Sequence, residues 1–271
     1  MASLVLKGLA VGYPEGSPVV SGIDLVLPDA GVTAVLGTNG SGKSTLLKTI
    51  ARILRPLSGA AILDGQDIHH TPTKELARRL AILGQDPPIP RDMTVRELVA
   101  YGRSPHRRPL RAATDDDRAR VADALEATGT VPLADTPLDR LSGGQRQRAW
   151  IAMALAQDAP TILLDEPTSF LDIEHQLEVL LLLRGLADTR GKQIVMVVHD
   201  IDQALGYADH VVVLHEGRVV AAGPPGEVLT PELILRVFHV RAVIRPGPGG
   251  RAHCLPYALA GREPRDAPWH V

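Results

Sequence analysis

The chain has 271 residues, of which 45% are hydrophobic and 22% charged, with a formal net charge of −2. This balance is typical of a globular protein with a sizeable core, and it excludes disordered, collagen-like and disulfide-stapled chains. Aromatic residues make up only 3% and there is no global basic charge, so no nucleic-acid partner is expected.

No apolar segment is long enough to cross a bilayer. The longest unbroken apolar run, residues 149–156, falls far short of the roughly 20 residues that a transmembrane helix needs. Lys7 interrupts the first apolar stretch, which argues against a signal peptide. The single cysteine, Cys254, fits a reducing compartment. We therefore expect a cytoplasmic chain that reaches a membrane only through a partner.

The first third of the chain predicts alternating strands and helices. Residues 34–36 form an apolar run that ends in a glycine-rich turn, as a buried strand does. From Ser44, apolar residues recur at helical spacing as far as Leu54, where Arg55-Pro56 ends the pattern. Residues 61–63 and 80–83 are predicted to be two further strands.

The middle of the chain, about residues 86–160, changes to a mostly helical pattern. Thr94 with Glu97 and Thr114 with Asp117 have the spacing of N-terminal capping boxes. Another helix is predicted over residues 144–157. This pattern predicts a mostly helical insert in an α/β protein.

Strands and helices alternate again after the insert. Residues 161–164 and 194–198 are predicted strands, with a helix over residues 173–190 between them. Four leucines of this helix are expected on its apolar side, namely Leu177, Leu180, Leu181 and Leu183.

The last part of the chain predicts a hairpin and a final helix. The hairpin turns at Glu216-Gly217, and the helix starts at Thr230-Pro231. Residues 241–271 are rich in proline and glycine and predict a short strand or two and a loose tail. The alternation as a whole predicts an α/β fold with a parallel-rich sheet covered by helices.

The sequence GTNGSGKS at residues 37–44 fits the pattern of a phosphate-binding loop between a strand and a helix. Its glycines let backbone N–H groups turn toward a polyphosphate at a helix N-terminus. Lys43 would reach the outer phosphates, and Ser44 can offer its hydroxyl to magnesium. We therefore predict phosphate binding here.

An apolar strand at residues 162–164 ends in the acids Asp165 and Glu166. Open α/β sheets bind ligands at the carboxyl ends of their strands. One acid could hold magnesium while the next polarises a water molecule, which is what nucleotide hydrolysis requires. The alternative interpretation is a polar turn introduced by Pro167.

Residues 142–145, Ser-Gly-Gly-Gln, begin a predicted helix and have the spacing of a capping box. Two adjacent glycines at a helix start also expose N–H groups and make a second anion site. Two anion sites in one chain predict either two nucleotides or one nucleotide shared between chains.

Three other side chains are candidates by position. His199 directly follows the strand at residues 194–198 and therefore lies at the same sheet edge as Asp165, which favours a phosphate or water contact. Gln85 follows the strand at residues 80–83, but alone it reads as a solvated turn residue. Tyr13, taken alone, reads as a packing residue.

In order and spacing, these motifs resemble the ATP-binding subunits of ABC transporters over about residues 4–240. The most specific motif is LSGGQ at residues 141–145, with LLDEP at residues 163–167 and His199 following in the family's order. The resemblance implies a P-loop NTPase core (about residues 2–85 and 161–240) with a mixed, largely parallel sheet, a helical ABC-specific subdomain (about residues 86–160), and an extension at residues 241–271.

The resemblance also implies the site residues, with ATP and Mg²⁺ as ligands. Tyr13 would stack on adenine, Glu166 would be the general base, and His199 would contact the γ-phosphate and the attacking water. Asp172 would communicate between chains. The phosphate-binding set would be Gly37, Asn39, Gly40, Ser41, Gly42, Lys43, Ser44 and Thr45, the set facing the second chain Ser142, Gly143, Gly144 and Gln145, and the magnesium set Ser44, Gln85 and Asp165.

In the family, the LSGGQ residues of one chain close over ATP bound to the other, so the resemblance implies a homodimer. It also implies membrane-spanning permease subunits that receive this closure through the helical insert and Gln85. An extracytoplasmic substrate-binding protein would be an indirect partner, and the chain would lie on the cytoplasmic face of the membrane.

A finer resemblance is to importers of iron–siderophore complexes, haem and vitamin B12. It depends on the sequence Tyr-Gly-Arg-Ser-Pro-His at residues 101–106 and on residues 199–204. An iron–siderophore importer is the leading hypothesis. A haem or cobalamin importer, an exporter, and a soluble ABC-type ATPase without a transport role are the alternatives.

Overall fold

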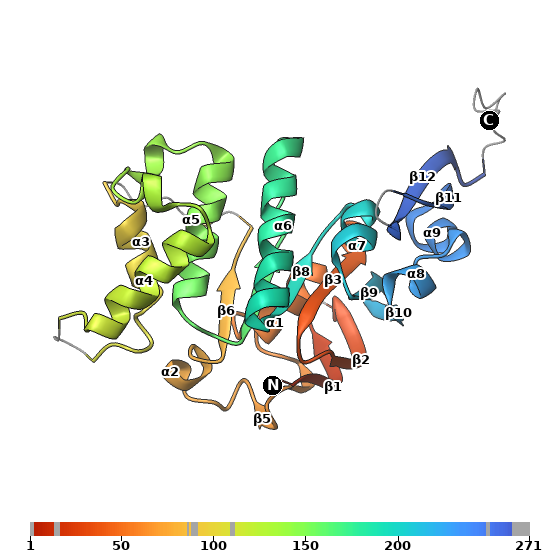
Figure 1. Cartoon of the computed structure of the whole chain (residues 1–271). Helices are drawn as coiled ribbons and strands as arrows, with labels where there is room; N and C mark the ends of the chain where they lie inside the picture. Colours follow the sequence, from red (N-terminus) through yellow and green to blue (C-terminus); the bar gives the residue numbers. More distant parts are fainter. Residues whose placement is uncertain are drawn as a thin grey trace.

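A six-stranded, largely parallel sheet runs through the middle of the molecule (Figure 1). The computed structural model describes residues 3–13, 17–85, 87, 92–108, 112–247 and 250–261. The strand order is β10-β9-β3-β8-β7-β6, in which the β9–β10 pair is antiparallel and the other neighbours run parallel. These strands are β3 (Gly31–Gly37), β6 (Leu80–Leu83), β7 (Thr161–Asp165), β8 (Gln193–Val197), β9 (His210–His215) and β10 (Arg218–Gly223).

A second, antiparallel sheet has the strand order β2-β1-β4-β5. The apolar pattern predicted part of β4 (Ser58–Leu63), but it did not predict β1 (Leu4–Val11), β2 (Val20–Leu27) or the short β5 (Gln66–Asp67). The pairing of β1 with β2 shifts register twice, and Gly8 and Gly22 have positive φ angles. Such bulges interrupt the strict alternation by which a half-buried strand is recognised in a sequence.

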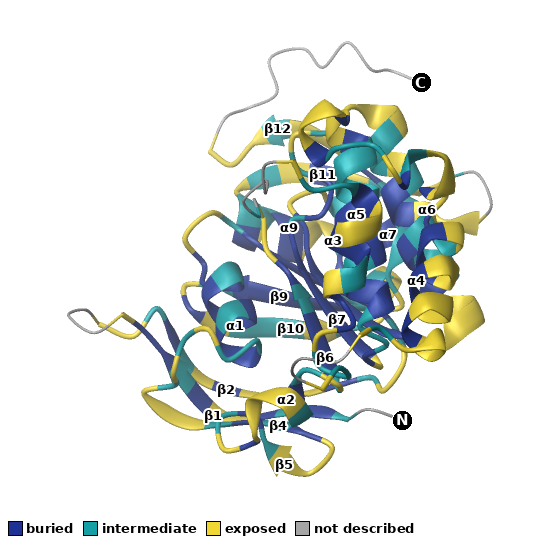
Figure 2. Ribbon diagram, turned by 90° about the vertical axis from the view of Figure 1, so that its left-hand side faces the viewer, coloured by how far each residue is buried: buried dark blue, intermediate teal, exposed yellow. Residues whose placement is uncertain are grey.

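Each strand of the central sheet contributes side chains to two cores. In β3, Ala34 and Leu36 belong to the core under the larger helices, whereas Val35 belongs to the core around α1 (Lys43–Ile50). This alternation follows from the pleat of a strand that is buried on both faces. Figure 2 shows these buried strands, with α1 on one side of them and the larger helices on the other.

The middle of the chain is helical, as predicted. It contains α3 (Val95–Tyr101), α4 (Asp115–Ala127), α5 (Gly143–Ala156) and two short 3₁₀ turns (Val131–Leu133 and Leu138–Arg140). The three predicted capping boxes are confirmed, because Thr94, Thr114 and Ser142 each accept a backbone N–H three residues on and receive the reciprocal bond. We call α3, α4 and α5 together the helical block.

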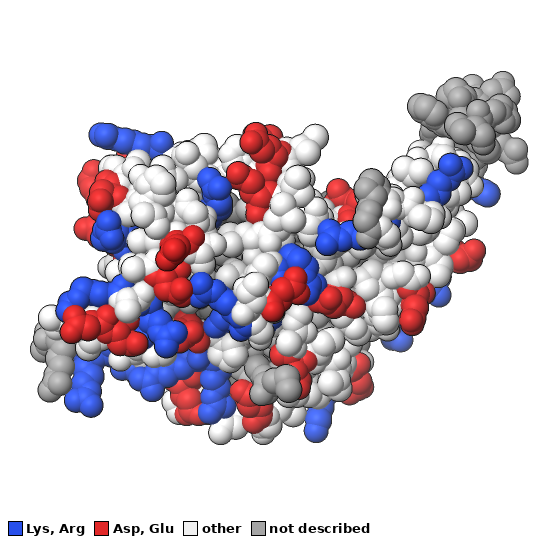
Figure 3. Space-filling model, in the orientation of Figure 1, with Lys and Arg blue, Asp and Glu red and all other residues white. Residues whose placement is uncertain are grey.

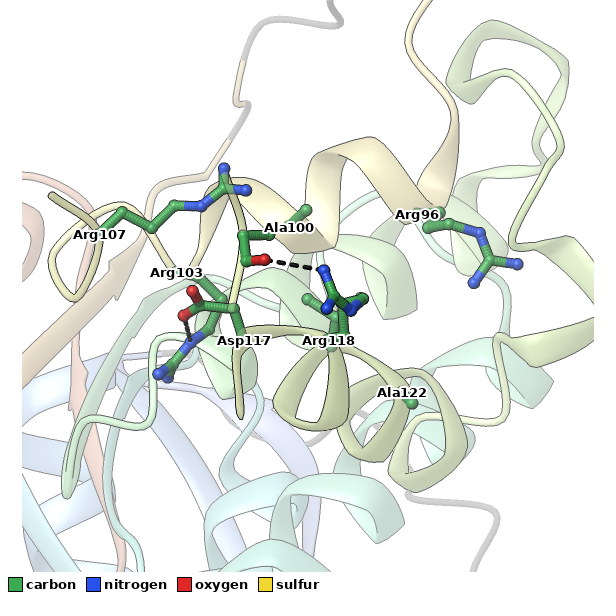
Figure 4. A pocket seen from close by; sticks show the side chains of 9 residues that line it. Arg96, Ala100, Arg103, Arg107, Asp117, Arg118 and Ala122 are labelled. Atoms are coloured by element: carbon green, nitrogen blue, oxygen red, sulfur yellow. Dashed lines mark hydrogen bonds and ion pairs between the residues drawn. The ribbon is translucent and has the colours of Figure 1, made fainter. Parts of the chain in front are cut away.

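A buried ion pair holds the helical block together. Arg103, which follows α3, donates from Nε to Asp117 at 3.0 Å and from Nη1 to the Ala156 carbonyl at 3.0 Å. Figure 4 shows the first of these contacts beside a cavity between α3 and α4. Arg103 therefore connects all three helices. On the face shown in Figure 3, side chains of both signs lie interspersed over this block.

The first helix ends earlier than its apolar pattern predicted. The pattern extends to Leu54, but α1 ends at Ile50 and Arg52 adopts a positive φ of 62°. Ile53 is 61% exposed, so no packing supports another helical turn. The prediction of a helix over residues 44–54 was therefore wrong in its last turn.

Helix α6 (Ile173–Arg190) has the predicted bounds but a different buried face. Leu180 and Leu183 are buried, whereas Leu177 and Leu181 are 44% and 53% exposed. The prediction that all four leucines lie on the apolar side was therefore wrong for two of them. The buried face of α6 is narrower than its composition suggests because α6 packs on the sheet along one side only.

These two leucine environments predict unequal costs of truncation. Leu183→Ala removes a fully packed side chain and should lower the free energy of unfolding by about 2–4 kcal/mol. Leu181→Ala changes a largely exposed side chain and should lower it by less than about 1 kcal/mol. Urea unfolding followed by circular dichroism measures both variants. Equal costs would contradict the burial pattern of α6.

The remaining helices are shorter. They are α2 (Thr73–Leu76), α7 (Ile201–Tyr207), α8 (Pro225–Val228) and α9 (Pro231–Phe238). The last begins where it was predicted, and the side chain of Thr230 caps it. Within the described ranges, no helix combines the length and the apolarity needed to cross a membrane.

The chain continues beyond α9 into a third, two-stranded sheet. It consists of β11 (Val240–Pro246) and β12 (Ala252–Leu259), which confirms the expected strand or two. The backbone N–H of Cys254 donates to Asp202 at 2.7 Å, so the hairpin packs against α7. The predicted tail beyond residue 261 lies outside the described residues.

Candidate active site

The phosphate-binding loop joins β3 to α1 with a backbone that requires glycine. Gly42, the residue before α1, has a φ of 99°, and Gly37 has a φ of 153°. A Cβ atom at Gly37 would lie 2.2 Å from the Leu214 carbonyl oxygen, and one at Gly42 would lie 2.4 Å from a methyl group of Val20. Both glycines are therefore required by backbone angle and by close approach.

Lys43 is buried against the loop that it follows. Its Nζ atom donates to the carbonyl oxygens of Gly37 at 2.9 Å and Thr38 at 3.0 Å. Burial lowers the pKa of Lys43, and the nearby carboxylates of Glu166 and Asp165 oppose this effect. A buried cation that is held by neutral carbonyl groups can exchange them for phosphate oxygens.

The hydroxyl of Ser41 gives a direct test of whether this loop fits a polyphosphate. It is buried and has no hydrogen-bond partner within the described part of the chain. An unpaired buried hydroxyl is costly, so a site that leaves one facing the loop is suited to a ligand that accepts hydrogen bonds.

Asp165 and Ser44 meet at the carboxyl edge of the sheet. Ser44 Oγ donates to Asp165 Oδ1 at 2.9 Å, and Asp165 is only 4% exposed. Burial raises the pKa of Asp165, while the hydrogen bond from Ser44 lowers it and the charge of Glu166 raises it. A hydroxyl and a carboxylate side by side are oxygen donors of the kind that magnesium prefers, so these residues fit that ion.

Glu166 is held by three side chains from different segments. Its carboxylate lies 2.6 Å from His199 Nε2, and it accepts hydrogen bonds from Gln85 Nε2 at 2.7 Å and from Ser169 Oγ at 2.8 Å. Its φ of 54° is unusual for a residue other than glycine. Strained backbone of this kind is typical of functional sites.

Ser169 was missed as a contact of Glu166 by sequence reasoning. A serine three residues after a glutamate at the end of a strand carries no distinctive pattern. The contact forms because the chain turns directly after β7, and the Ser169 N–H bonds back to the Glu166 carbonyl at 3.1 Å.

The structure brings eight of the predicted residues to one cavity of about 270 Å³. The loop, the acid and the histidine come from three distant segments and meet because β3, β7 and β8 are neighbours in the sheet. The lining residues are Val19, Asn39, Gly40, Gly42, Lys43, Ser44, Thr45, Glu166 and His199.

Residues 142–145 lie at the start of α5 and do not line this cavity. Ser142 caps α5, and Asp172 caps α6 beside it by accepting the His175 N–H at 3.0 Å. Tyr13 is 49% exposed and also lies outside the cavity lining. One part of the predicted set therefore lines the cavity, a second part lies at the starts of α5 and α6, and Tyr13 belongs to neither.

The sequence matches a family model. The model, described as ABC transporter, matches residues 20–169, which is more than half of the chain. The chain belongs to the ABC transporter family. Subunits of this type in ABC transporters hydrolyse ATP to power transport, work with membrane permeases and dimerise. The ATPase activity and the family predicted from the motifs are thereby confirmed.

Curated ABC transporter proteins are similar to the chain over nearly its whole length. The achromobactin transport ATP-binding protein of Dickeya dadantii is 47% identical over 97% of both chains. The iron(3+)-hydroxamate import ATP-binding protein of Bacillus subtilis is 43% identical over 97% of this chain and 98% of its own. The ferric enterobactin transport ATP-binding protein of Escherichia coli is 46% identical over 92% of this chain and 91% of its own.

Solved ABC structures confirm the predicted P-loop fold with its largely parallel sheet. An inward-facing metal-chelate type ABC transporter matches with a TM-score of 0.82 and 29% identity, over 94% of this chain and 98% of its own. A dimeric ATP-binding cassette bound to ADP and Pi matches with a TM-score of 0.71 and 27% identity, over 82% of this chain and 98% of its own.

Proposed function

We propose that the chain is the ATP-hydrolysing subunit of an importer for iron–siderophore complexes. The observation that carries this proposal is the near-full-length similarity to siderophore transport subunits, at 42–47% identity. A cobalamin import ATP-binding protein of Halobacterium salinarum is 40% identical, but the chain spans only 61% of its length. Cobalamin import is therefore the second candidate, with haem import alongside it.

We infer that ATP binds in the cavity between the phosphate-binding loop and Glu166. Lys43 would exchange its loop carbonyls for the outer phosphates, and Ser41 would donate its free hydroxyl. Backbone N–H groups of residues 37–45 would complete the cradle. Tyr13 would stack on the adenine.

Magnesium would be held by Ser44 and Asp165, with Gln85 as a further oxygen donor, and it would neutralise charge on the phosphates. Gln85 donates to Glu166 at 2.7 Å, so it would connect the metal ligands to the base. Burial of Asp165 keeps its carboxylate beside Ser44 in a fixed position.

Glu166 would act as the general base. Its contacts with His199, Gln85 and Ser169 hold the carboxylate at the edge of the cavity, where it can accept a proton from the attacking water. His199 would orient that water and contact the γ-phosphate. Lys43 would offset the charge that develops on the transferred phosphoryl group.

A complete site would need two copies of the chain. Residues 142–145 present the N-terminus of a 14-residue helix, α5, which is suited to an anion, yet they lie outside the cavity of their own chain. We infer that residues 142–145 (Ser142, Gly143, Gly144 and Gln145) bind the nucleotide of a second chain. Asp172 would communicate between the two chains when they close. One nucleotide shared between two chains accounts for both anion sites.

The helical block would form a subdomain of about residues 86–160 that transmits closure to permease subunits. Gln85 immediately precedes this subdomain and contacts the base, so it joins the two parts of the cassette. The chain would lie at the cytoplasmic face of the membrane, and an extracytoplasmic binding protein would deliver the iron complex to the permease.

A pull-down tests the transport function. Tagged Glu166→Gln protein would be held closed with Mg-ATP and recovered from detergent-solubilised membranes. We expect a polytopic permease encoded beside an extracytoplasmic binding protein, whose affinity for ferric siderophores, haem and cobalamin is then measured by fluorescence quenching. Recovery of ribosomes or soluble proteins alone would contradict a transport role, and preference for cobalamin or haem would contradict the siderophore assignment.

A further inference from the structure

His175 lies between two segments that the proposed function brings to the second nucleotide. It is in the first turn of α6, and its Nδ1 atom is 2.6 Å from Asp172 Oδ1. The same carboxylate oxygen accepts the His175 backbone N–H at 3.0 Å. Asp172 is therefore fixed by both the backbone and the ring of one residue.

The His175 ring packs directly on the backbone of Gly144 in α5. A Cβ atom at Gly144 would lie 1.9 Å from His175 Cδ2 and 2.4 Å from Cγ. Gly144 is a helical residue without a positive φ, so its backbone angles would accept alanine. By contrast, a Cβ atom at Gly143 would meet Leu171 at an ordinary 3.4 Å. The requirement for glycine at position 144 therefore comes from His175.

Charges around His175 strengthen its contact with Asp172. The hydrogen bond that His175 donates to Asp172 raises the pKa of His175, with the charges of Glu178 and Glu174 adding to the effect. From α5, Arg148 approaches Glu178 at 3.3 Å and makes a second connection between the two helices. A charge-assisted bond is stronger than a neutral one, so the contact is firmer when the ring is protonated.

We propose that His175 is a positioning residue that joins Asp172 to the start of α5, so that Asp172 and residues 142–145 meet the second chain's nucleotide as one rigid unit. This inference rests on the proposed function, in which both segments face that nucleotide. His175 itself touches no substrate. It acts by holding two segments from different helices in fixed register.

A double-mutant cycle of Gly144→Ala and His175→Ala tests the proposal. His175→Ala keeps the backbone N–H that caps α6, so the helix retains its start. In the double variant, His175→Ala removes the two ring atoms that would lie 1.9 and 2.4 Å from the methyl group of Ala at position 144. The Cβ atom of residue 175 stays 2.8 Å from that methyl group, so the steric clash is only partly relieved. The readouts are kcat and KM for ATP hydrolysis, the Tm of each variant, and ATP-dependent dimerisation measured in the Glu166→Gln background.

We expect Gly144→Ala to lower kcat by about tenfold or more through overpacking, and His175→Ala to lower it by about threefold, with KM for ATP little changed in both. The double variant should recover to within about threefold of His175→Ala alone, because coupled sites are not additive. His175→Asn, which keeps a donor near Asp172, should restore most of the activity lost in His175→Ala.

Independent effects of the two substitutions, or His175→Ala with wild-type kcat and dimerisation, would overturn the proposal. The same holds if His175→Asn is as impaired as His175→Ala, since the bond to Asp172 would then be unimportant. If the wild-type chain neither hydrolyses ATP nor dimerises with ATP, the proposed function fails and the inference falls with it. A wild-type chain that does both, with an additive cycle, overturns the inference alone.

Discussion

Glu166→Gln is expected to lower the rate of ATP hydrolysis by about 100-fold or more while ATP binding is retained. The amide cannot accept the proton of the attacking water, but it keeps the size of the carboxylate and an oxygen for the bonds from Gln85 and Ser169. The loop and Lys43 remain in place. Phosphate release measures turnover, and a fluorescent ATP analogue measures binding.

A matched control separates loss of the base from a general effect of removing a carboxylate. Glu227→Gln makes the same chemical change on α8, at an exposed position outside the cavity. Its turnover should stay within about twofold of wild type, as for an ordinary surface substitution. Substantial hydrolysis by Glu166→Gln, or loss of its ATP binding, would contradict the role that we give Glu166.

The part of the site that the sequence predicts best consists of short motifs whose residues are contiguous in the chain. The loop at residues 37–44 joins β3 to α1 as predicted, because the loop's glycines and the flanking apolar runs act locally. His199 and Asp165 could be placed at one edge because parallel strands end together. Sequence alone therefore predicted the sheet edge and most of the cavity lining.

The contacts that sequence could not predict depend on which helix packs against which. Gly144 and His175 are 31 positions apart in the numbering, and no local pattern connects a glycine on one helix with a ring on another. The exposure of Leu177 and Leu181 could not be predicted for the same reason. The hydrophobicity of a helix does not show how much of its surface the sheet covers. The bulged β1 and β2 were missed because their alternation is broken.

The segment at residues 101–106, which carries the finer resemblance to importers of iron–siderophore complexes, haem and vitamin B12, has a structural role in the fold. A Cβ atom at Gly102 would lie 2.2 Å from the Met153 carbonyl oxygen, so α3 and α5 approach each other closely there. Arg103 then bonds α4 and the end of α5. The segment therefore sets the geometry of the helical block.

Asp117→Ala is expected to lower the free energy of unfolding by about 2–4 kcal/mol, because it leaves the Arg103 guanidinium buried without its main partner. Arg103 is 3% exposed and Asp117 is 5% exposed. The change also removes one half of the capping box at the start of α4. Urea unfolding measures the loss.

Asp116→Ala is the matched control for this loss. Asp116 also contacts Arg103, at 3.2 Å from Nη2, but its side chain is 66% exposed. Solvent screens that pair, so its removal should cost less than about 1 kcal/mol. If the two variants lost equal stability, the buried pair would not be what holds α3 to α4.

The same pair predicts how stability changes with pH. Burial favours a raised pKa for Asp117, but hydrogen bonds from Thr114 and Arg103 outweigh it and lower the pKa to about 2. Since an unfolded aspartate titrates near pH ~3.9, this contribution is fully present above about pH 5 and is lost as the pH falls toward 2. The stability difference between wild type and Asp117→Asn, which cannot titrate, should therefore shrink between about pH 5 and pH 3. A difference that stays constant over that range would mean that the ionised carboxylate does not stabilise the fold.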